Sequence, residues 1–305
     1  GTSAPSEGFA LVDSNTIIFG ANLQTGDSVF IVQIGSAITI STPGDGTVST
    51  AKIASGAVTT AKVADGAITA AKLAAGAASV ISDAQQNTIA GTSAGSNFSG
   101  TDAVRNTLFG YNSGGSITTG DDNTLVGRST GEQLSTGSKN TAIGKSALAS
   151  NTTADENTAL GYHSLLANTT GSHNTAVGAY ALDANTTASY NNAFGKFTLT
   201  ANTTGASNNG FGHAVLYTNT TGINNNGFGH LALHLNTTGS RNSAFGHEAL
   251  YSNTTGVNNS ALGVSSLKDT TTGSYNTAVG NNSLADNTTG NYNTAVGNNA
   301  LLVST

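Results

Sequence analysis

From Asn106 to the C-terminus, apolar and polar residues recur with a period of 17 that never slips. The repeat reads N-T-A-V-G-x-x-A-L-x-x-N-T-T-G-x-x, and a looser copy begins at Asn87. Twelve copies without an insertion indicate one physical unit stacked on itself. The leading asparagines are Asn106, Asn123, Asn140, Asn157, Asn174, Asn191, Asn208, Asn225, Asn242, Asn259, Asn276 and Asn293.

Each copy predicts one coil of a parallel β-solenoid, also called a β-roll. In the copy that begins at Asn174, the first five residues suit a short strand that ends at Gly178. Glycine holds this fifth place in all twelve copies, which implies a positive φ or no room for a Cβ. The fifteenth place, Gly or Ala, predicts a second corner. Two strands and two corners then make one coil, and twelve coils at the strand spacing of ~4.8 Å make a rod of about 58 Å.

Stacking places identical positions directly above each other. Asn174 and Asn185 belong to two predicted asparagine ladders, whose amides donate to one neighbour and accept from the other. The alternative interpretation of N-T-T is a glycosylation acceptor. We do not favour it, because a glycan on every coil would not fit at the strand spacing.

Two adjacent positions of the predicted strand are apolar. The fourth position, with Val177, Phe211 and Phe228, is predicted to fill the coil interior together with ninth-position leucines such as Leu182. The third position, mostly alanine, is apolar as well. Because strand residues alternate between faces, this pattern predicts that both faces are dry. One face fills the coil and the other needs a partner, so we expect a homo-oligomer of intertwined or side-by-side chains.

Two further zones precede the array at 81–305. Residues 1–45 carry strand signals at 9–12, 16–19, 29–32 and 38–40, and predict a small β module. Residues 46–80 repeat every ten residues, from Gly46 to Gly76. Each decapeptide offers too few apolar side chains to bury within one chain, which favours a shaft of several chains wound together. A flexible Ala/Gly linker is the alternative.

The composition excludes several classes of function. Charged residues are 9% of the chain, the net charge is −6, and apolar residues recur on schedule, a pattern that favours order over disorder. With no cysteine, neither disulfides nor cysteine-based metal sites are possible. No run of apolar residues is long enough for a membrane span, and the mild acidity argues against nucleic acid.

No catalytic or cofactor-binding motif emerges. Gly144-Lys145-Ser146 resembles the end of a phosphate-binding loop, but Lys139 stands where that motif requires glycine. The acidic pairs at 121–122 and 155–156 are expected to be solvated at corners. We therefore expect no catalytic residue, no cofactor and no enzyme activity.

One set of histidines is unusual. His213, His230 and His247 hold the sixth position of three successive coils and are predicted to stack. A ladder of neutral imidazoles at a solvent-facing corner is the favoured interpretation. A metal or anion site is the weaker alternative, because histidine is a common ligand.

The repeat is similar to the N-S-V-A-I-G coils of trimeric autotransporter adhesin heads. It more closely resembles tail fibres of bacteriophages, particularly marine and cyanobacterial ones, in which arrays like N-T-A-V-G with N-T-T-G connections follow decapeptides like that at 56–65. The segment at 25–35 also looks like an N-terminal module of such fibres. The resemblance implies a homotrimer.

The expected function is that of a structural tail-fibre subunit of a virion, outside the cell, used in host attachment. Its expected partners are itself, other tail proteins and host-surface glycans, without nucleic acid or membrane insertion. The head of a bacterial surface adhesin is the main alternative. An ice-binding solenoid and a polysaccharide-cleaving enzyme are less favoured, because the paired threonines do not make a flat two-row array and acidic residues are few.

Overall fold

The computed structural model describes residues 9–13, 16–19, 81–98 and 102–302 of the chain. The described residues belong to two units, an N-terminal hairpin and a C-terminal solenoid. The strands predicted at 29–32 and 38–40 lie outside the described residues, as does the decapeptide segment at 46–80.

The N-terminal unit contains an antiparallel β-hairpin. Strand β1 (Phe9–Asp13) pairs with β2 (Thr16–Phe19), so that Phe9 lies opposite Phe19. The register shifts between Leu11 and Asp13, an irregularity of the β-bulge type. The first two strands predicted from apolar runs are therefore confirmed.

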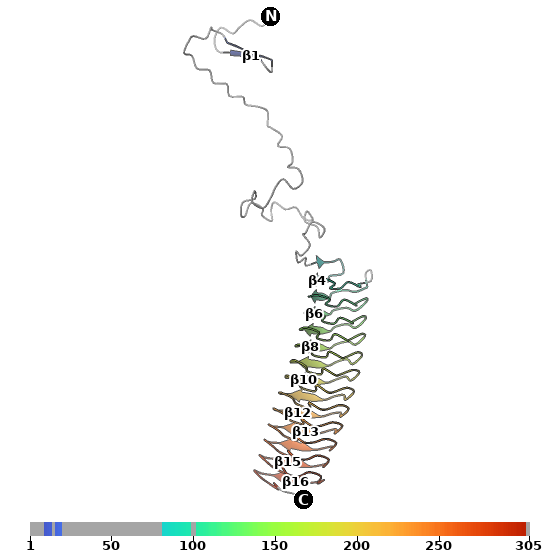
Figure 1. Cartoon of the computed structure of the whole chain (residues 1–305), viewed down its shortest axis with the longest axis vertical. Coiled ribbons are helices and arrows are strands. Elements are labelled where there is room, and N and C mark those ends of the chain that lie inside the picture. Colours follow the sequence, from blue (N-terminus) through green and yellow to red (C-terminus); the bar gives the residue numbers. More distant parts are fainter. Residues whose placement is uncertain (1–8, 14–15, 20–80, 99–101, 303–305) are drawn as a thin grey trace, which may run out of the picture. The chain divides into compact units, whose positions relative to one another are not determined.

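The C-terminal unit is a β-solenoid whose parallel strands, one per coil, form a single sheet (Figure 1). Neighbouring strands pair in register at a 17-residue offset, as Thr175 does with Asn192. At the N-terminal edge, β3 (Ile81–Ser82) pairs antiparallel with β4 (Thr88–Ala90). The remaining strands are β5 (Thr107–Phe109), β6 (Thr124–Val126), β7 (Thr141–Ile143), β8 (Thr158–Leu160), β9 (Thr175–Val177), β10 (Asn192–Phe194), β11 (Asn209–Phe211), β12 (Asn226–Phe228), β13 (Ser243–Phe245), β14 (Ser260–Leu262), β15 (Thr277–Val279) and β16 (Thr294–Val296). The predicted all-β parallel solenoid of 17-residue coils is confirmed. Among the described residues, no helix is long and apolar enough to cross a membrane.

Each coil contains one three-residue strand, where the sequence predicted two. The opposite side of the coil is a turn in which the seventh and ninth residues adopt left-handed backbone, as Ser146 and Leu148 do with φ near 55°. Coils still bond to each other there, since the Leu148 amide donates to the Ser164 carbonyl at 3.0 Å. A left-handed residue costs roughly 1–2 kcal/mol. Full burial of the ninth-position leucine contributes ~1.5–3 kcal/mol, which offsets the cost at its own position.

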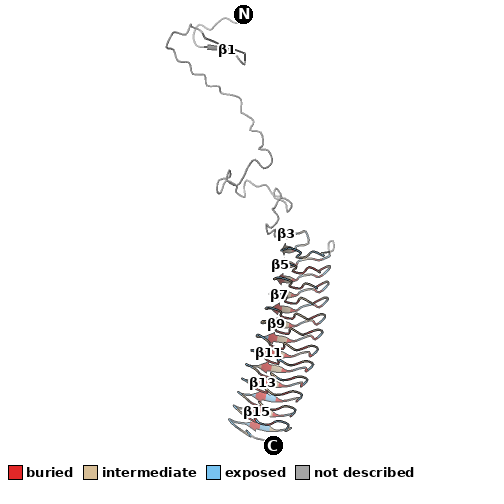
Figure 2. Ribbon diagram, in the orientation of Figure 1, coloured by how far each residue is buried: buried red, intermediate tan, exposed pale blue. Residues whose placement is uncertain are grey.

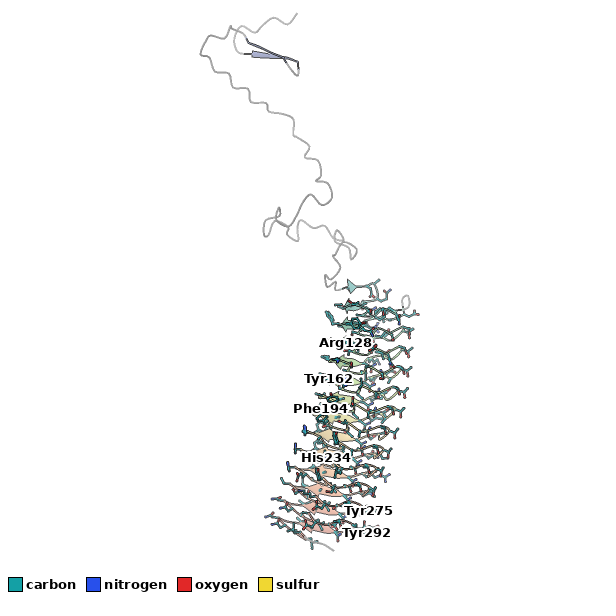
Figure 3. The ribbon with its side chains drawn as sticks, viewed as in Figure 1. Arg128, Tyr162, Phe194, His234, Tyr275 and Tyr292 are labelled. Carbon is teal, nitrogen blue, oxygen red and sulfur yellow. The ribbon has the colours of Figure 1, made fainter. Side chains whose placement is uncertain are left out.

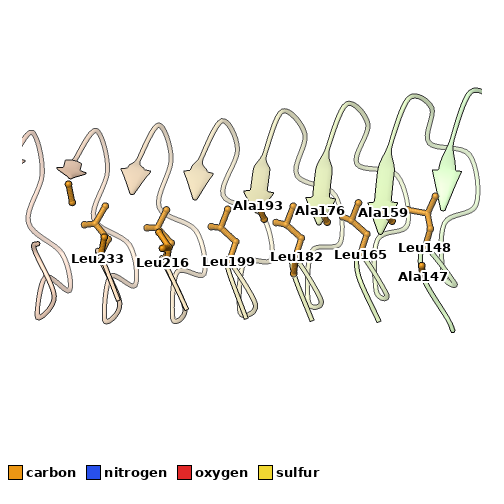
Figure 4. Packing of buried hydrophobic residues seen from close by; sticks show 14 of the residues in the cluster. Ala147, Leu148, Ala159, Leu165, Ala176, Leu182, Ala193, Leu199, Leu216 and Leu233 are labelled. Carbon is orange, nitrogen blue, oxygen red and sulfur yellow. The ribbon is translucent and has the colours of Figure 1, made fainter. Parts of the chain in front are cut away.

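The third and fourth positions of the strand face the opposite sides from those predicted. Third-position residues such as Ala176 are fully buried and face the ninth-position leucines (Figure 4). Fourth-position residues such as Val177 are more exposed and lie on the outer face. The strands of the sheet thus contain both buried and less buried residues (Figure 2). Phe211 and Phe228 likewise lie outside. The physical reason is space, because a leucine that reaches across the narrow coil leaves room only for a small residue opposite it.

Two kinds of coil show this limit on space. In the coil that begins at Asn106, Leu108 and Ile117 are buried and the ninth residue is Gly114. A Cβ added to Gly114 would lie 2.7 Å from Ile117 Cδ1 and 2.9 Å from Leu108 Cδ2. Later coils place leucine at the ninth position, alanine or glycine at the third, and usually asparagine at the twelfth. The side chains in the interior therefore have a nearly constant total volume, although different positions of the coil supply the large residues.

The fifth-position glycine fixes how closely the coils stack. Gly178 has a φ of 133°, and a Cβ added to it would lie 2.6 Å from the carbonyl oxygen of Gly195 in the next coil. Both conditions inferred from the sequence, a positive φ and a lack of room, hold at this position.

Candidate interaction surfaces of the solenoid

The first asparagine of each coil is buried and forms hydrogen bonds to the neighbouring coils. The backbone amide of Asn174 donates to Asn157 Oδ1 at 2.9 Å, and Asn174 Oδ1 accepts from the Asn191 amide at 3.0 Å. The Asn174 side-chain amide also donates to the Ala188 carbonyl, at 2.8 Å, which closes its own coil. The ladder therefore runs from side chain to backbone, and fixes the register of each strand on the next.

The second asparagine, at the twelfth position, forms a ladder between side chains. Asn185 donates from Nδ2 to Asn168 Oδ1 at 2.8 Å and to the Ala188 carbonyl at 3.0 Å. Asn185 is fully buried, so its amide nitrogen is not available to a glycan on the folded coil. Thr270 takes the asparagine's place in one coil, and both its hydroxyl and Asn253 Oδ1 are buried without a hydrogen-bond partner.

The two threonines of N-T-T have different environments. The thirteenth-position hydroxyl bonds to the next coil, as Thr186 does to the Thr203 carbonyl at 3.2 Å. The fourteenth-position threonine is exposed in each coil, for example Thr187. Only a single row of free threonines results, which does not supply the flat two-row array that we associate with ice binding.

The outer face of the sheet carries an apolar column, which we define as the fourth-position residues. Four of its phenylalanine rings stack in sequence at centroid distances of 4.7, 4.7 and 4.8 Å (Figure 3 labels Phe194). Others are well exposed, with Leu262 at 53%. Second-position Thr, Asn or Ser flanks the column. Its members are Phe109, Val126, Ile143, Leu160, Val177, Phe194, Phe211, Phe228, Phe245, Leu262, Val279 and Val296.

Charges of alternating sign occupy the seventeenth position of the first coils. Arg105 Nε bonds Asp122 at 2.6 Å, and Glu156 lies 3.4 Å from Lys139 Nζ and 3.1 Å from His173 Nδ1. The hydrogen bond from Arg105 lowers the pKa of the Asp122 carboxyl. The acidic pairs that the sequence placed at solvated corners thus take part in contacts between coils. Asp121 and Asp155 accept backbone amides, from Val104 at 2.9 Å and from Ser138 at 2.7 Å.

The three histidines of the sixth position stack as a ladder. Ring centroids are 5.3 Å apart between His213 and His230 and 5.2 Å apart between His230 and His247, and all three side chains are exposed. The preceding coil has Lys196 at the same position, and we call these four residues the basic column. No group of three or more metal-ligating side chains with metal-binding geometry occurs among the described residues.

A second ladder of rings was missed in the sequence. Tyr217, His234 and Tyr251 occupy the tenth position of the same three coils, with centroids 5.1 and 5.2 Å apart (Figure 3 labels His234). His234 Nδ1 also lies 3.0 Å from the Ala214 carbonyl, which holds its ring. We call these three residues the ring column. Their 17-residue spacing was visible in the sequence, but the tenth position varies too much elsewhere to draw attention.

Comparison of the chain with models of protein families, with curated proteins and with solved structures finds no match. The functional interpretation therefore depends on the surfaces themselves and on the resemblance of the repeats.

Proposed function

We propose that this chain is a structural subunit of a bacteriophage tail fibre, in which three copies form a rigid rod that attaches the particle to a host surface. The observation that carries the proposal is the apolar column, which places one outward hydrophobic residue in every coil from Phe109 to Val296. Contiguous apolar surface of this kind marks an interaction site on soluble proteins. The repeats and decapeptides, which resemble those of phage tail fibres, support the identity of the assembly.

A second copy of the chain accounts for the column better than an unrelated partner. The column has the pitch of the coil itself, so a parallel copy would meet an equivalent residue at every level along the rod. The flanking Thr, Asn and Ser residues supply a polar rim, as is usual around the apolar centre of an interface. Packing around a common axis closes the assembly, and the resemblance favours three-fold closure.

Attachment by such a rod works through reach and repetition. Three identical outer surfaces on each fibre, and several fibres on each particle, raise avidity without a tight single site. In this proposal the chain is part of the virion and extracellular, contacts other tail proteins, and meets glycans of the host surface. It has no enzymatic role, and it neither binds nucleic acid nor enters the membrane.

The assembly is tested by the mass of the chain in solution, measured by light scattering. A trimer of 30.2 kDa chains has a mass of about 90 kDa. The variant Phe211→Ser with Phe228→Ser is expected to lower that mass, because it removes the middle of the apolar column. The matched control, Thr221→Ser with Thr238→Ser, changes exposed positions of the same two coils and should remain trimeric. A wild-type mass near 30 kDa would contradict the proposal.

The identity of the assembly needs a separate experiment. Antibodies raised against the solenoid should label the fibres of intact phage particles in electron micrographs. Both assemblies share a trimeric rod, so the mass alone does not separate them. Labelling of a bacterial cell surface in the absence of phage would favour the adhesin head instead.

A further inference from the structure

The basic column and the ring column lie side by side on the coils that begin at Asn208, Asn225 and Asn242. Phe197 contacts the first aromatic ring of each column edge-on, at 6.1 Å from His213 and 6.2 Å from Tyr217 between ring centroids. At the other end, Glu248 lies 4.0 Å from His247 Nδ1. The same carboxylate binds Lys268 Nζ at 2.8 Å, and Lys268 is the tenth-position residue of the next coil. Phe197 touches both columns at one end, and at the other end Glu248 joins His247 to Lys268, which continues the line of the ring column by one coil. The two columns therefore belong to one surface.

The basic column is a row of one lysine and three histidines with few acidic side chains beside it. Lys196 Nζ lies over the Phe197 ring, 4.6 Å from its centroid, and His213, His230 and His247 follow at one residue per coil. Glu248 is the acid that the structure pairs with this column, and Lys268 already engages it. Protonated imidazoles on neighbouring coils would repel each other. A chain of negative groups laid along the column would remove that repulsion.

We infer that this surface binds an extended acidic polysaccharide along the axis of the rod, a role that rests on the proposed function in attachment. The ring column supplies hydroxyl groups from Tyr217 and Tyr251, which can bond to sugar hydroxyls beside the charged groups. The repeat of one coil, seen in ring spacings of 5.1 to 5.3 Å, is close to the length of one sugar ring in an extended chain. Nucleic acid is the other extended polyanion, and the experiment below compares it directly with the polysaccharides.

We expect the binding to strengthen as the pH falls, because a protonated imidazole attracts an anionic ligand and a neutral imidazole does not. The other charged groups beside the column, Glu248 and Lys268, are bonded to each other. We therefore assign the pH dependence of binding to the three histidines.

Heparin and alginate serve as sulfated and carboxylated probes, with neutral dextran and single-stranded DNA as comparisons. Affinity for the full-length protein is measured by calorimetry at pH 5.5 and 7.5 and at one low ionic strength. Both acidic polysaccharides should bind roughly tenfold more tightly at the lower pH, the combined effect expected of three exposed ion pairs. Dextran should bind at neither pH. Equal or tighter binding of DNA would overturn the assignment to a polysaccharide.

Two variants locate the site. His213→Asn with His230→Asn and His247→Asn should abolish the pH dependence, and asparagine already holds the sixth position at Asn281 and Asn298. The control His173→Asn removes a histidine from another column and should leave binding unchanged. Tyr217→Ala with Tyr251→Ala should weaken binding at both pH values. Unaltered binding in the triple variant would overturn the inference. The mass of each variant separates this result from a failure of the proposed assembly, because a trimer that does not bind contradicts the polysaccharide site alone.

Discussion

The coils that begin at Asn106 and Asn123 differ from the later coils in how they fill the same interior. The early coils place leucine on the strand, at Leu108 and Leu125, and leave glycine at the ninth position. The later coils place leucine at the ninth position and leave alanine or glycine on the strand. Both kinds stack in register in one sheet. The interior volume and the backbone of the coil are therefore kept constant, whereas the side that supplies the large residue is free to change.

The eighth residue of one coil and the third residue of the next compensate for each other in the same way. Thr198 and Val215 are larger than the usual eighth residue, and the third residue of the following coil is then glycine, Gly210 or Gly227. A Cβ added to Gly227 would clash with Val215 Cγ1. Packing between successive coils is therefore compensated in the same way as packing within one coil.

The largest effect is expected from removal of a leucine from either kind of coil. Leu125→Ala and Leu182→Ala each leave a cavity in a fully buried site and should lower the free energy of unfolding by about 3 kcal/mol. Urea unfolding at one protein concentration measures both, with Thr187→Ser as the surface control. A loss confined to one of the two variants would contradict the view that both leucines fill equivalent space.

Overfilling an early coil should have the next largest effect. Gly131→Leu adds a side chain where a Cβ alone would lie 2.7 Å from Leu125 Cδ1, and should cost about 2 kcal/mol of unfolding free energy. Addition of Leu125→Ala and Leu134→Asn turns this coil into the later kind and should restore most of the loss. If the triple variant is no more stable than the single one, compensation within the coil is wrong.

Completion of the second asparagine ladder should stabilise the later coils. Thr270→Asn supplies the donor that Asn253 Oδ1 lacks, in the way that Asn253 itself donates to Asn236 Oδ1 at 2.6 Å. We expect a gain of about 1 kcal/mol, seen as a higher melting temperature. Thr272→Asn, at an exposed position of the same coil, is the matched control and should change little.

The smallest effect is expected at the exposed charges of the seventeenth position. Asp122→Asn removes the partner of Arg105, but both side chains are exposed, so the change should be slight. The pKa of Asp122 is lowered in the folded chain, so the pair stabilises above the ordinary aspartate pKa. That contribution is lost as the pH falls through the lowered value. Thermal unfolding should therefore separate the variant from the wild type at pH 7 and not at pH 2.

The sequence predicted the fold well where one position repeats without change. The constant fifth glycine and the 17-residue period sufficed for coils, register and ladders. The sequence did not show which strand residue faces the interior, because Ala176 and Val177 are both apolar and alternation is compatible with either one facing inward. The Leu–Gly exchange at 108 and 114 carried the missing information. The second strand of each coil was a wrong prediction because nothing in the residue types marks Leu148 as left-handed.

The surfaces were less predictable than the interior. The histidine ladder was evident from three successive positions. The neighbouring ring column was not evident from the sequence, because only the folded coil brings Tyr217 close to Phe197 and so to His213. Adjacency across a corner depends on the path of the turn, which residue periodicity does not encode.

The central claim, that the small residue faces inward and the large one faces a sister chain, can be tested by cysteine cross-linking because the chain has no cysteine of its own. Ala176→Cys and Val177→Cys are oxidised under the same conditions and separated on a denaturing gel. We expect chains linked through Cys at position 177 and a protected, unlinked thiol at position 176. Cross-linking through position 176, with none through position 177, would contradict it.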